Sequence, residues 1–187
     1  MFSFKGFITT EKNTHLEHLE DDIINRGSDG GRNAISFLKS VRNMLAGSSS
    51  GRVNMSVKWD GAPAIIAGKN PENGKFFVGT KSVFNKTPKI NYTPGDIARN
   101  HSGPVAAKLL VCLRELKRLG INGIYQGDLL FTKGDTKLAG IDGQKMITFT
   151  PNTITYAVPI NSSLGRRISR ARLGIVFHTY YTGKSMS

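Results

Sequence analysis

The chain has 187 residues, of which 39% are hydrophobic and 21% are charged. This size and composition predict one ordinary globular domain, or one domain with a small helical appendage. The 26 lysines and arginines outnumber the 13 acidic residues and leave a net charge of +13. This excess favours a protein that binds a polyanion over one that is merely basic, and nucleic acid is the first candidate for that partner. The single cysteine, Cys112, excludes an internal disulfide and a multi-cysteine metal site.

The sequence contains no segment typical of membrane insertion or export. Its apolar runs stay well short of the roughly 20 residues that span a bilayer, and its N-terminus lacks the basic and apolar regions of a signal peptide. One cysteine in an apolar helical pattern fits a packed thiol in a reducing compartment. We therefore expect a cytoplasmic protein with no membrane partner.

Two helices are expected in the first fifty residues. A capping box at Thr14–Glu17 predicts a helix from about Thr14 to Asn25, ended by Gly27. Apolar residues at helical spacing from Ala34 to Leu45 predict a second helix, closed by Gly47. The glycine and serine residues that follow form a flexible connection. Residues 1–50 are thus expected to form a helical segment.

Residues 51–187 are expected to form a separate α+β domain built on antiparallel sheet. A helix that opens at Gly103-Pro104 and closes at Gly120 directs Val105, Leu109, Leu113 and Leu116 inward. A short basic helix is expected from Ser162 to Ala171. Strands are expected at Ala64–Ala67, Phe76–Gly79, Ile124–Phe131, Lys145–Phe149, Thr153–Val158 and Leu173–Thr179. Runs of strands with helices set between them are typical of α+β proteins.

Lys58 stands at the end of a predicted strand, a position that favours a functional role for the lysine over a role in packing. Val53–Val57 alternates apolar and polar residues, which puts Lys58 and Asp60 on the polar face. Gly61 then breaks the strand and permits a close backbone approach. A free lysine has a pKa near 10.4, so a nucleophilic lysine needs desolvation, nearby cations or a metal ion to lose its proton.

Further polar residues follow Lys58 in a fixed order along the chain. Lys81 comes just after the predicted hairpin, and Asp128 interrupts an apolar strand. A carboxylate there is costly unless it binds a cation or a polar ligand, although an ion pair with a lysine is the simpler alternative. Phe149 lies on a later strand, and Gly174-Ile175-Val176 begins the last one.

This order of motifs resembles the covalent nucleotidyltransferase superfamily of ATP-dependent DNA ligases, RNA ligases and capping enzymes. The resemblance covers roughly Val53 to Thr179 and is strongest to ligase-like proteins of tailed bacteriophages. It implies an antiparallel-sheet core like a ligase adenylation domain, without a C-terminal OB-fold, and ATP and Mg²⁺ as cofactors. It also implies nucleic-acid ends or nicks as substrate, and the host cytoplasm as location if a phage encodes the chain.

The resemblance assigns a role to each matching residue. Lys58 would attack the α-phosphate of ATP and carry AMP, while Asp60 orients the lysine and the ribose. Gly61 and Lys81 would contact the nucleotide, and Lys81 also the polynucleotide end. Asp128 would bind the ribose or Mg²⁺. Phe149 would stack on the purine.

Two departures from the family pattern keep another class of function open. Leu173 stands where the family has an acidic residue before the glycine, and the later lysine pair has no counterpart besides Lys184. The alternative is therefore a catalytically degenerate protein of a phage that binds nucleic acid or nucleotide. A small virion or accessory structural protein is a third reading. His178 is a candidate to contact phosphate or metal in place of the absent acid.

The densest basic cluster lies near the C-terminal end of the chain. Arg166, Arg167 and Arg170 fall on overlapping faces of the short basic helix, and Arg172 follows it. A solvated charged face is one explanation, but the excess positive charge favours contact with a phosphate backbone. No residue pattern distinguishes DNA from RNA. Trp59, opposite the polar row, is expected in the core.

Overall fold

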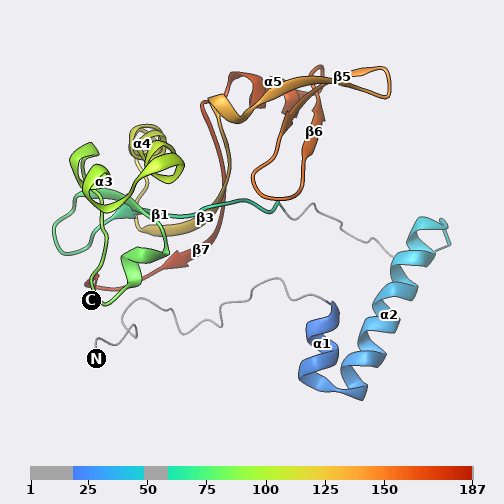
Figure 1. The fold of residues 1–187 in the computed structure, drawn as a ribbon. Helices are drawn as coiled ribbons and strands as arrows, with labels where there is room; N and C mark the ends of the chain where they lie inside the picture. Colours follow the sequence, from blue (N-terminus) through green and yellow to red (C-terminus); the bar gives the residue numbers. More distant parts are fainter. Residues whose placement is uncertain (1–18, 49–58, 187) are drawn as a thin grey trace. The chain divides into compact units, whose positions relative to one another are not determined.

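The computed structural model of the protein describes residues 19–48 and 59–186 (Figure 1). These residues fall into two compact units, a helical pair and a strand-rich unit that begins at Trp59. The predicted capping box at Thr14–Glu17, the predicted strand Val53–Val57 and Lys58 lie outside the described residues.

The helical unit consists of two helices, both predicted from the sequence. Helix α1 (Leu19–Arg26) and helix α2 (Ser28–Leu45) are joined by Gly27, whose φ of 57° suits glycine. A Cβ at Gly30 would lie 1.9 Å from the carbonyl oxygen of Asp22, so the contact between the helices requires a glycine there. The pair is too small to bury all its apolar residues, and Ile24, for example, stays 77% exposed.

The strand-rich unit is built on a four-stranded antiparallel sheet with the order β2-β1-β3-β7. Strand β1 (Ala64–Lys69) and strand β2 (Phe76–Gly79) form the predicted hairpin. Strand β3 (Ile124–Thr132) is central and pairs with β1 on one side and with β7 (Leu173–Tyr181) on the other. Figure 1 shows β3 and β7 continuing from this sheet toward the second one.

The second sheet has three antiparallel strands in the order β4-β5-β6. These are β4 (Lys137–Ile141), β5 (Gln144–Phe149) and β6 (Tyr156–Pro159). Strand β4 was not predicted, because it lies largely in solvent and therefore lacks an apolar alternation. The turn that joins it to β5, Asp142-Gly143, has φ values of 49° and 73°, as a tight two-residue hairpin requires.

The helices of this unit are α3 (Pro94–Asn100), α4 (Gly103–Lys117) and α5 (Ser163–Arg170), with short 3₁₀ turns at Lys81–Phe84 and Lys133–Asp135. The sequence predicted α4 and α5 but not α3, whose seven residues give little periodicity. The Thr93–Asp96 capping box marks its start. In α4 the buried positions are Leu109, Cys112, Leu113 and Leu116, so the prediction that Val105 points inward was wrong.

Apolar side chains pack on both faces of the four-stranded sheet. Ile65, Val78 and Leu129 pack on one face against α3 and α4. Ile66 and Phe77 pack on the other. A third cluster joins the second sheet to α5 through Ile147, Phe149, Val158 and Ile168. The architecture is therefore α+β with antiparallel sheets, as predicted, and the finer expectation of a ligase-type core remains a prediction.

The buried thiol of Cys112 provides a test of this packing. Its residue is 0% exposed, and burial raises the pKa of Cys112 from 9.0 to about 12. Because the thiolate is the reacting form, iodoacetamide at pH 8 should leave the native protein unmodified and alkylate it rapidly in guanidinium chloride, as measured by intact mass. Rapid alkylation of the native protein would show that α4 does not pack on the sheet in this way.

Candidate active site

The segment that directly follows Lys58 is anchored to the second sheet. The backbone N–H of Asp60 donates a hydrogen bond of 2.8 Å to the Tyr156 hydroxyl, which lies 3.3 Å from the Asp60 carbonyl oxygen. The Trp59 ring packs on Tyr156 with 4.9 Å between ring centroids and on Phe149 with 6.3 Å. Trp59 thus belongs to the edge of the core, as predicted. Lys58 itself lies outside the described residues.

The same segment is also joined to the central strand of the first sheet. The N–H of Ala62 donates to the carbonyl oxygen of Leu129 at 3.0 Å, and the N–H of Leu129 donates to the Pro63 carbonyl at 3.1 Å. A Cβ at Gly61 would lie 2.5 Å from the Leu129 oxygen and 3.1 Å from the Cβ of Asp128. Only glycine permits this approach, so Gly61 brings the backbone against Asp128.

Asp128 projects from the sheet face opposite α4. Its neighbour Leu129 packs against α4, and successive side chains on a strand point to opposite faces. The Asp128 side chain is 24% exposed, and its Oδ1 lies 3.6 Å from Nε2 of His178 on β7. The Nδ1 of His178 is 2.8 Å from the Thr179 hydroxyl. The predicted carboxylate therefore lies beside the predicted histidine.

Two further polar residues lie on this face and were not predicted as site residues. Gln126 precedes Asp128 by two residues and is 8% exposed; its Oε1 accepts a hydrogen bond of 2.6 Å from the Tyr181 hydroxyl. Thr179 is directly opposite Gln126 in the register and is also 8% exposed. We call Gln126, Asp128, His178 and Thr179 the polar strip. Polar side chains inside apolar strands are the sequence signal for it; that signal indicates Asp128, and His178 is the other predicted member.

Lys81 lies toward the same end of the sheet as Asp128. Gly79 pairs with Ile66, which pairs with Gln126, so Lys81 leaves β2 at the level of Asp128 with β1 between them. Two strand spacings make this separation about 10 Å at the backbone. Lys81 is exposed and begins a 3₁₀ turn that the Thr80 hydroxyl caps. The register thus brings Lys81 within reach of a ligand of nucleotide size over β1.

Phe149 is a core residue in this structure. It is 2% exposed, and its ring lies 4.8 Å from that of Phe131 and 5.4 Å from that of Tyr156. Alternation along β5 explains this, because Phe149 and Ile147 point into the same apolar cluster. For Phe149 to stack on a purine, as predicted, one of the neighbouring rings would have to move.

The arginines of α5 are exposed on the side of the helix away from its buried Gly165 and Ile168. Arg166 donates to the Asn161 carbonyl oxygen at 2.5 Å. The exposure of Arg166, Arg167 and Arg170 agrees with a solvated face and equally with a phosphate contact, so their predicted role in nucleic-acid binding stays a prediction.

Asp128 contributes a single carboxylate to any metal site here. Among residues 19–48 and 59–186, no group of three or more histidine, cysteine, aspartate or glutamate side chains is arranged to hold a metal ion. Mg²⁺ in nucleotide sites is commonly held by one or two carboxylates together with phosphate oxygens and water. Asp128 therefore fits a Mg²⁺ that arrives with a nucleotide. Leu173, in place of the family acid, packs against the α4 core and supplies no ligand.

The fold and the polar strip define an α+β protein that carries a half-buried carboxylate on the central strand of an antiparallel sheet. The chain belongs to a family of unknown function, DUF6267, which matches residues 13–187. No curated protein and no solved structure matches the chain. In the described part of the chain, every helix is too short or too polar to cross a membrane.

Tyr156 provides a test of how the Trp59–Gly61 segment is anchored. Tyr156→Phe should lower the free energy of unfolding by about 1 kcal/mol, because it removes the hydroxyl that bonds to Asp60. Tyr156→Ala should also shift the fluorescence of Trp59, the single tryptophan, to longer wavelength as its packing partner is lost. Tyr180→Phe, at a 48% exposed position, is the control. Unchanged stability and fluorescence in both Tyr156 variants would contradict the anchoring.

Proposed function

We propose that the protein is an ATP-dependent polynucleotide ligase-type nucleotidyltransferase in which Lys58 carries AMP. The observation that supports this most directly is the position of the residues that follow Lys58. Asp60 is bonded to the second sheet and Gly61 lies against Asp128 on the first. The order of motifs associates this same carboxylate with the lysine, although 66 residues lie between Gly61 and Asp128 in the sequence.

The proposed reaction has three balanced steps. In the first step, the neutral amine of Lys58 attacks the α-phosphorus of ATP and forms a nitrogen–phosphorus bond. The bond from the α-phosphorus to the bridging oxygen breaks and pyrophosphate leaves. The amine proton passes to solvent. A 5′-phosphate oxygen then attacks the same phosphorus and releases the lysine. A 3′-hydroxyl finally attacks the activated 5′-phosphate and displaces AMP.

The chain's own charges favour such chemistry. The part of the chain from Trp59 onward has 18 lysines and arginines against 7 acidic residues, and this positive excess attracts a negatively charged triphosphate. Lys81, at the level of Asp128, would neutralise phosphate charge. Asp128 would hold the ribose or a Mg²⁺, which when bound offsets negative charge on the phosphoryl oxygens.

His178 would take over part of the role of the missing family acid. It lies two strand residues after Val176, the register partner of Asp128, and its Nε2 faces the Asp128 carboxylate at 3.6 Å. A histidine beside a carboxylate can donate a hydrogen bond to a phosphate oxygen in its protonated form. This would leave the Leu173 position free for packing.

The test is covalent labelling with α-³²P-ATP and Mg²⁺. Wild type should acquire an acid-labile label, Lys58→Ala should acquire none, and Asp128→Asn should label at least about tenfold more slowly because it loses one stabilising group. Lys75→Ala, at an exposed loop lysine, should label like wild type. The absence of label with each of the four ribonucleotides, in Mg²⁺ or Mn²⁺, would rule the proposal out.

A second candidate is a nucleic-acid or nucleotide-binding protein without catalysis. The observation that favours it is Leu173, whose apolar side chain packs into the core where a metal-binding acid would be needed. This candidate predicts that wild type and Lys58→Ala bind nucleic acid equally well and that neither forms an adduct. The labelling experiment therefore separates the two.

A further inference from the structure

The excess positive charge of the chain is concentrated in its strand-rich part. Residues 1–58 contain eight lysines and arginines and six acidic residues, whereas the remainder contains 18 and seven. Several of the latter cations gather on the side of the unit formed by α4, the turn after β3 and the start of β7. This is the side of the sheet that Leu129 faces, opposite the polar strip.

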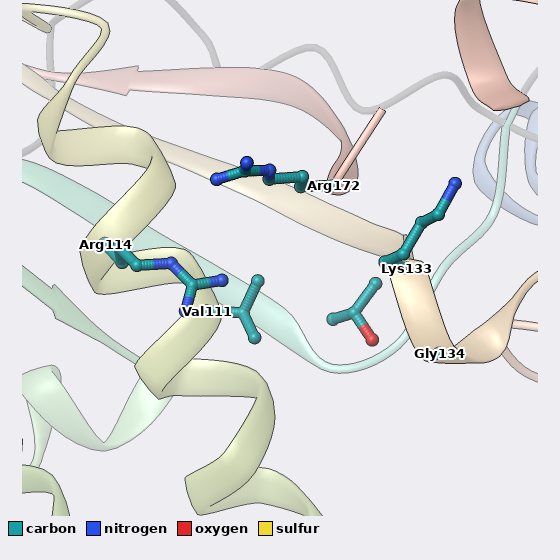
Figure 2. A pocket seen from close by; sticks show the side chains of 6 residues that line it. Val111, Arg114, Lys133, Gly134 and Arg172 are labelled. Carbon is teal, nitrogen blue, oxygen red and sulfur yellow. The ribbon is translucent and has the colours of Figure 1, made fainter. Parts of the chain in front are cut away.

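Two adjoining hollows lie at this side and share Arg172. One has a volume of about 460 Å³ and is lined by Val111, Arg114, Thr132, Lys133, Gly134 and Arg172. The other, of about 540 Å³, is lined by the end of α4, including Glu115 and Arg118, and by Arg170 at the end of α5. Figure 2 shows the side chains of Arg114 and Arg172 reaching from separate elements over the first hollow, with Lys133 on the turn at its far end. We call Arg114, Arg118, Lys133, Arg170 and Arg172 the basic groove.

One carboxylate holds three of these arginines together. Glu115 lies 2.6 Å from Arg114, 3.3 Å from Arg118 and 3.8 Å from Arg172. The hydrogen bond from Arg114, with the charges of the other two arginines, lowers the pKa of Glu115. A single negative charge cannot neutralise three guanidinium groups, so the groove keeps a positive excess.

Stabilisation of the helix end does not explain this arrangement. Basic residues in the last turn of a helix interact favourably with its dipole, and that accounts for Arg114 on α4. Arg172 and Lys133 belong to other elements and still line the same hollow. The side chains of Arg118 and Arg172 are 61% and 64% exposed, so both remain accessible to a ligand.

We propose that the basic groove binds the phosphodiester backbone of a polynucleotide. Guanidinium groups present paired donors that match phosphate oxygens, and a row of them along two joined hollows suits successive phosphates. The apolar side chains that also line the hollows, Val111 in one and Leu119 in the other, suit the sugars between phosphates. The groove offers cations and apolar surface, so binding should depend on charge and not on base sequence.

The basic groove rests on the proposed function in one respect, which is that the partner is a polynucleotide. The groove lies away from the polar strip and involves neither Lys58 nor Asp128. It would hold the body of the strand while the proposed chemistry acts on its end. Loss of adenylation and loss of groove binding can therefore be measured independently.

The experiment measures anisotropy of a fluorescein-labelled 30-nucleotide single-stranded DNA over a series of KCl concentrations, without ATP. The groove variant is Arg118→Gln with Arg172→Gln. It should bind at least about tenfold more weakly at low salt, and the slope of log K against log [salt] should become shallower by about 1.4, since each lost single-strand contact contributes about 0.7. Thermal unfolding followed by circular dichroism checks that the variant is folded.

Two matched variants remove the same charge elsewhere. Lys137→Gln with Lys145→Gln alters the exposed β4–β5 hairpin, and Lys69→Gln with Lys75→Gln alters two exposed lysines at the turn end of the β1–β2 hairpin. Each should change the affinity less than about threefold and leave the slope within about 0.3 of wild type. Equal losses in all three variants, or no loss in a folded groove variant, would overturn the proposal. So would polyglutamate that binds as tightly as the DNA and with the same dependence on the groove.

Discussion

Strand β3 is the element on which the rest of the strand-rich unit depends. It pairs with β1 and β7, supplies Leu129 to the packing under α4, and accepts the backbone of Ala62 through the Leu129 carbonyl. A buried backbone group must be paired, so these bonds fix where the chain crosses from the first sheet to the second. Asp128 lies at this crossing, and its surroundings follow from the pairing of its strand.

Much of this architecture could be predicted from the sequence, because its signals were local. Turn residues, caps and apolar spacing predict the β1–β2 hairpin, α4 and α5. Strand β4 and helix α3 could not be predicted in this way. The first is too exposed and the second too short to carry a hydrophobic period. Strand β4 is held by its hairpin pairing with β5, and α3 by the packing of Ile97 in the core.

The candidate site shows the same division between local and distant information. Asp128 was identifiable as an acid in an apolar strand, and Gly61 as a glycine after a strand. That Gly61 touches Asp128, that Gln126 and Thr179 share its face, and that Phe149 is enclosed by Trp59, Phe131 and Tyr156 depend on register and on packing between two sheets. A pattern along the chain does not encode which strands become neighbours.

The cluster around Glu115 has a consequence for how the protein would respond to its surroundings. The three arginines lower the pKa of Glu115, so this carboxylate stays ionised throughout the physiological pH range. Acidification within that range therefore leaves the local charge balance unchanged. Arginine itself does not titrate there either. Ionic strength, and not acidity, is then the environmental variable to which this region responds, as screening reaches exposed guanidinium groups at ordinary salt.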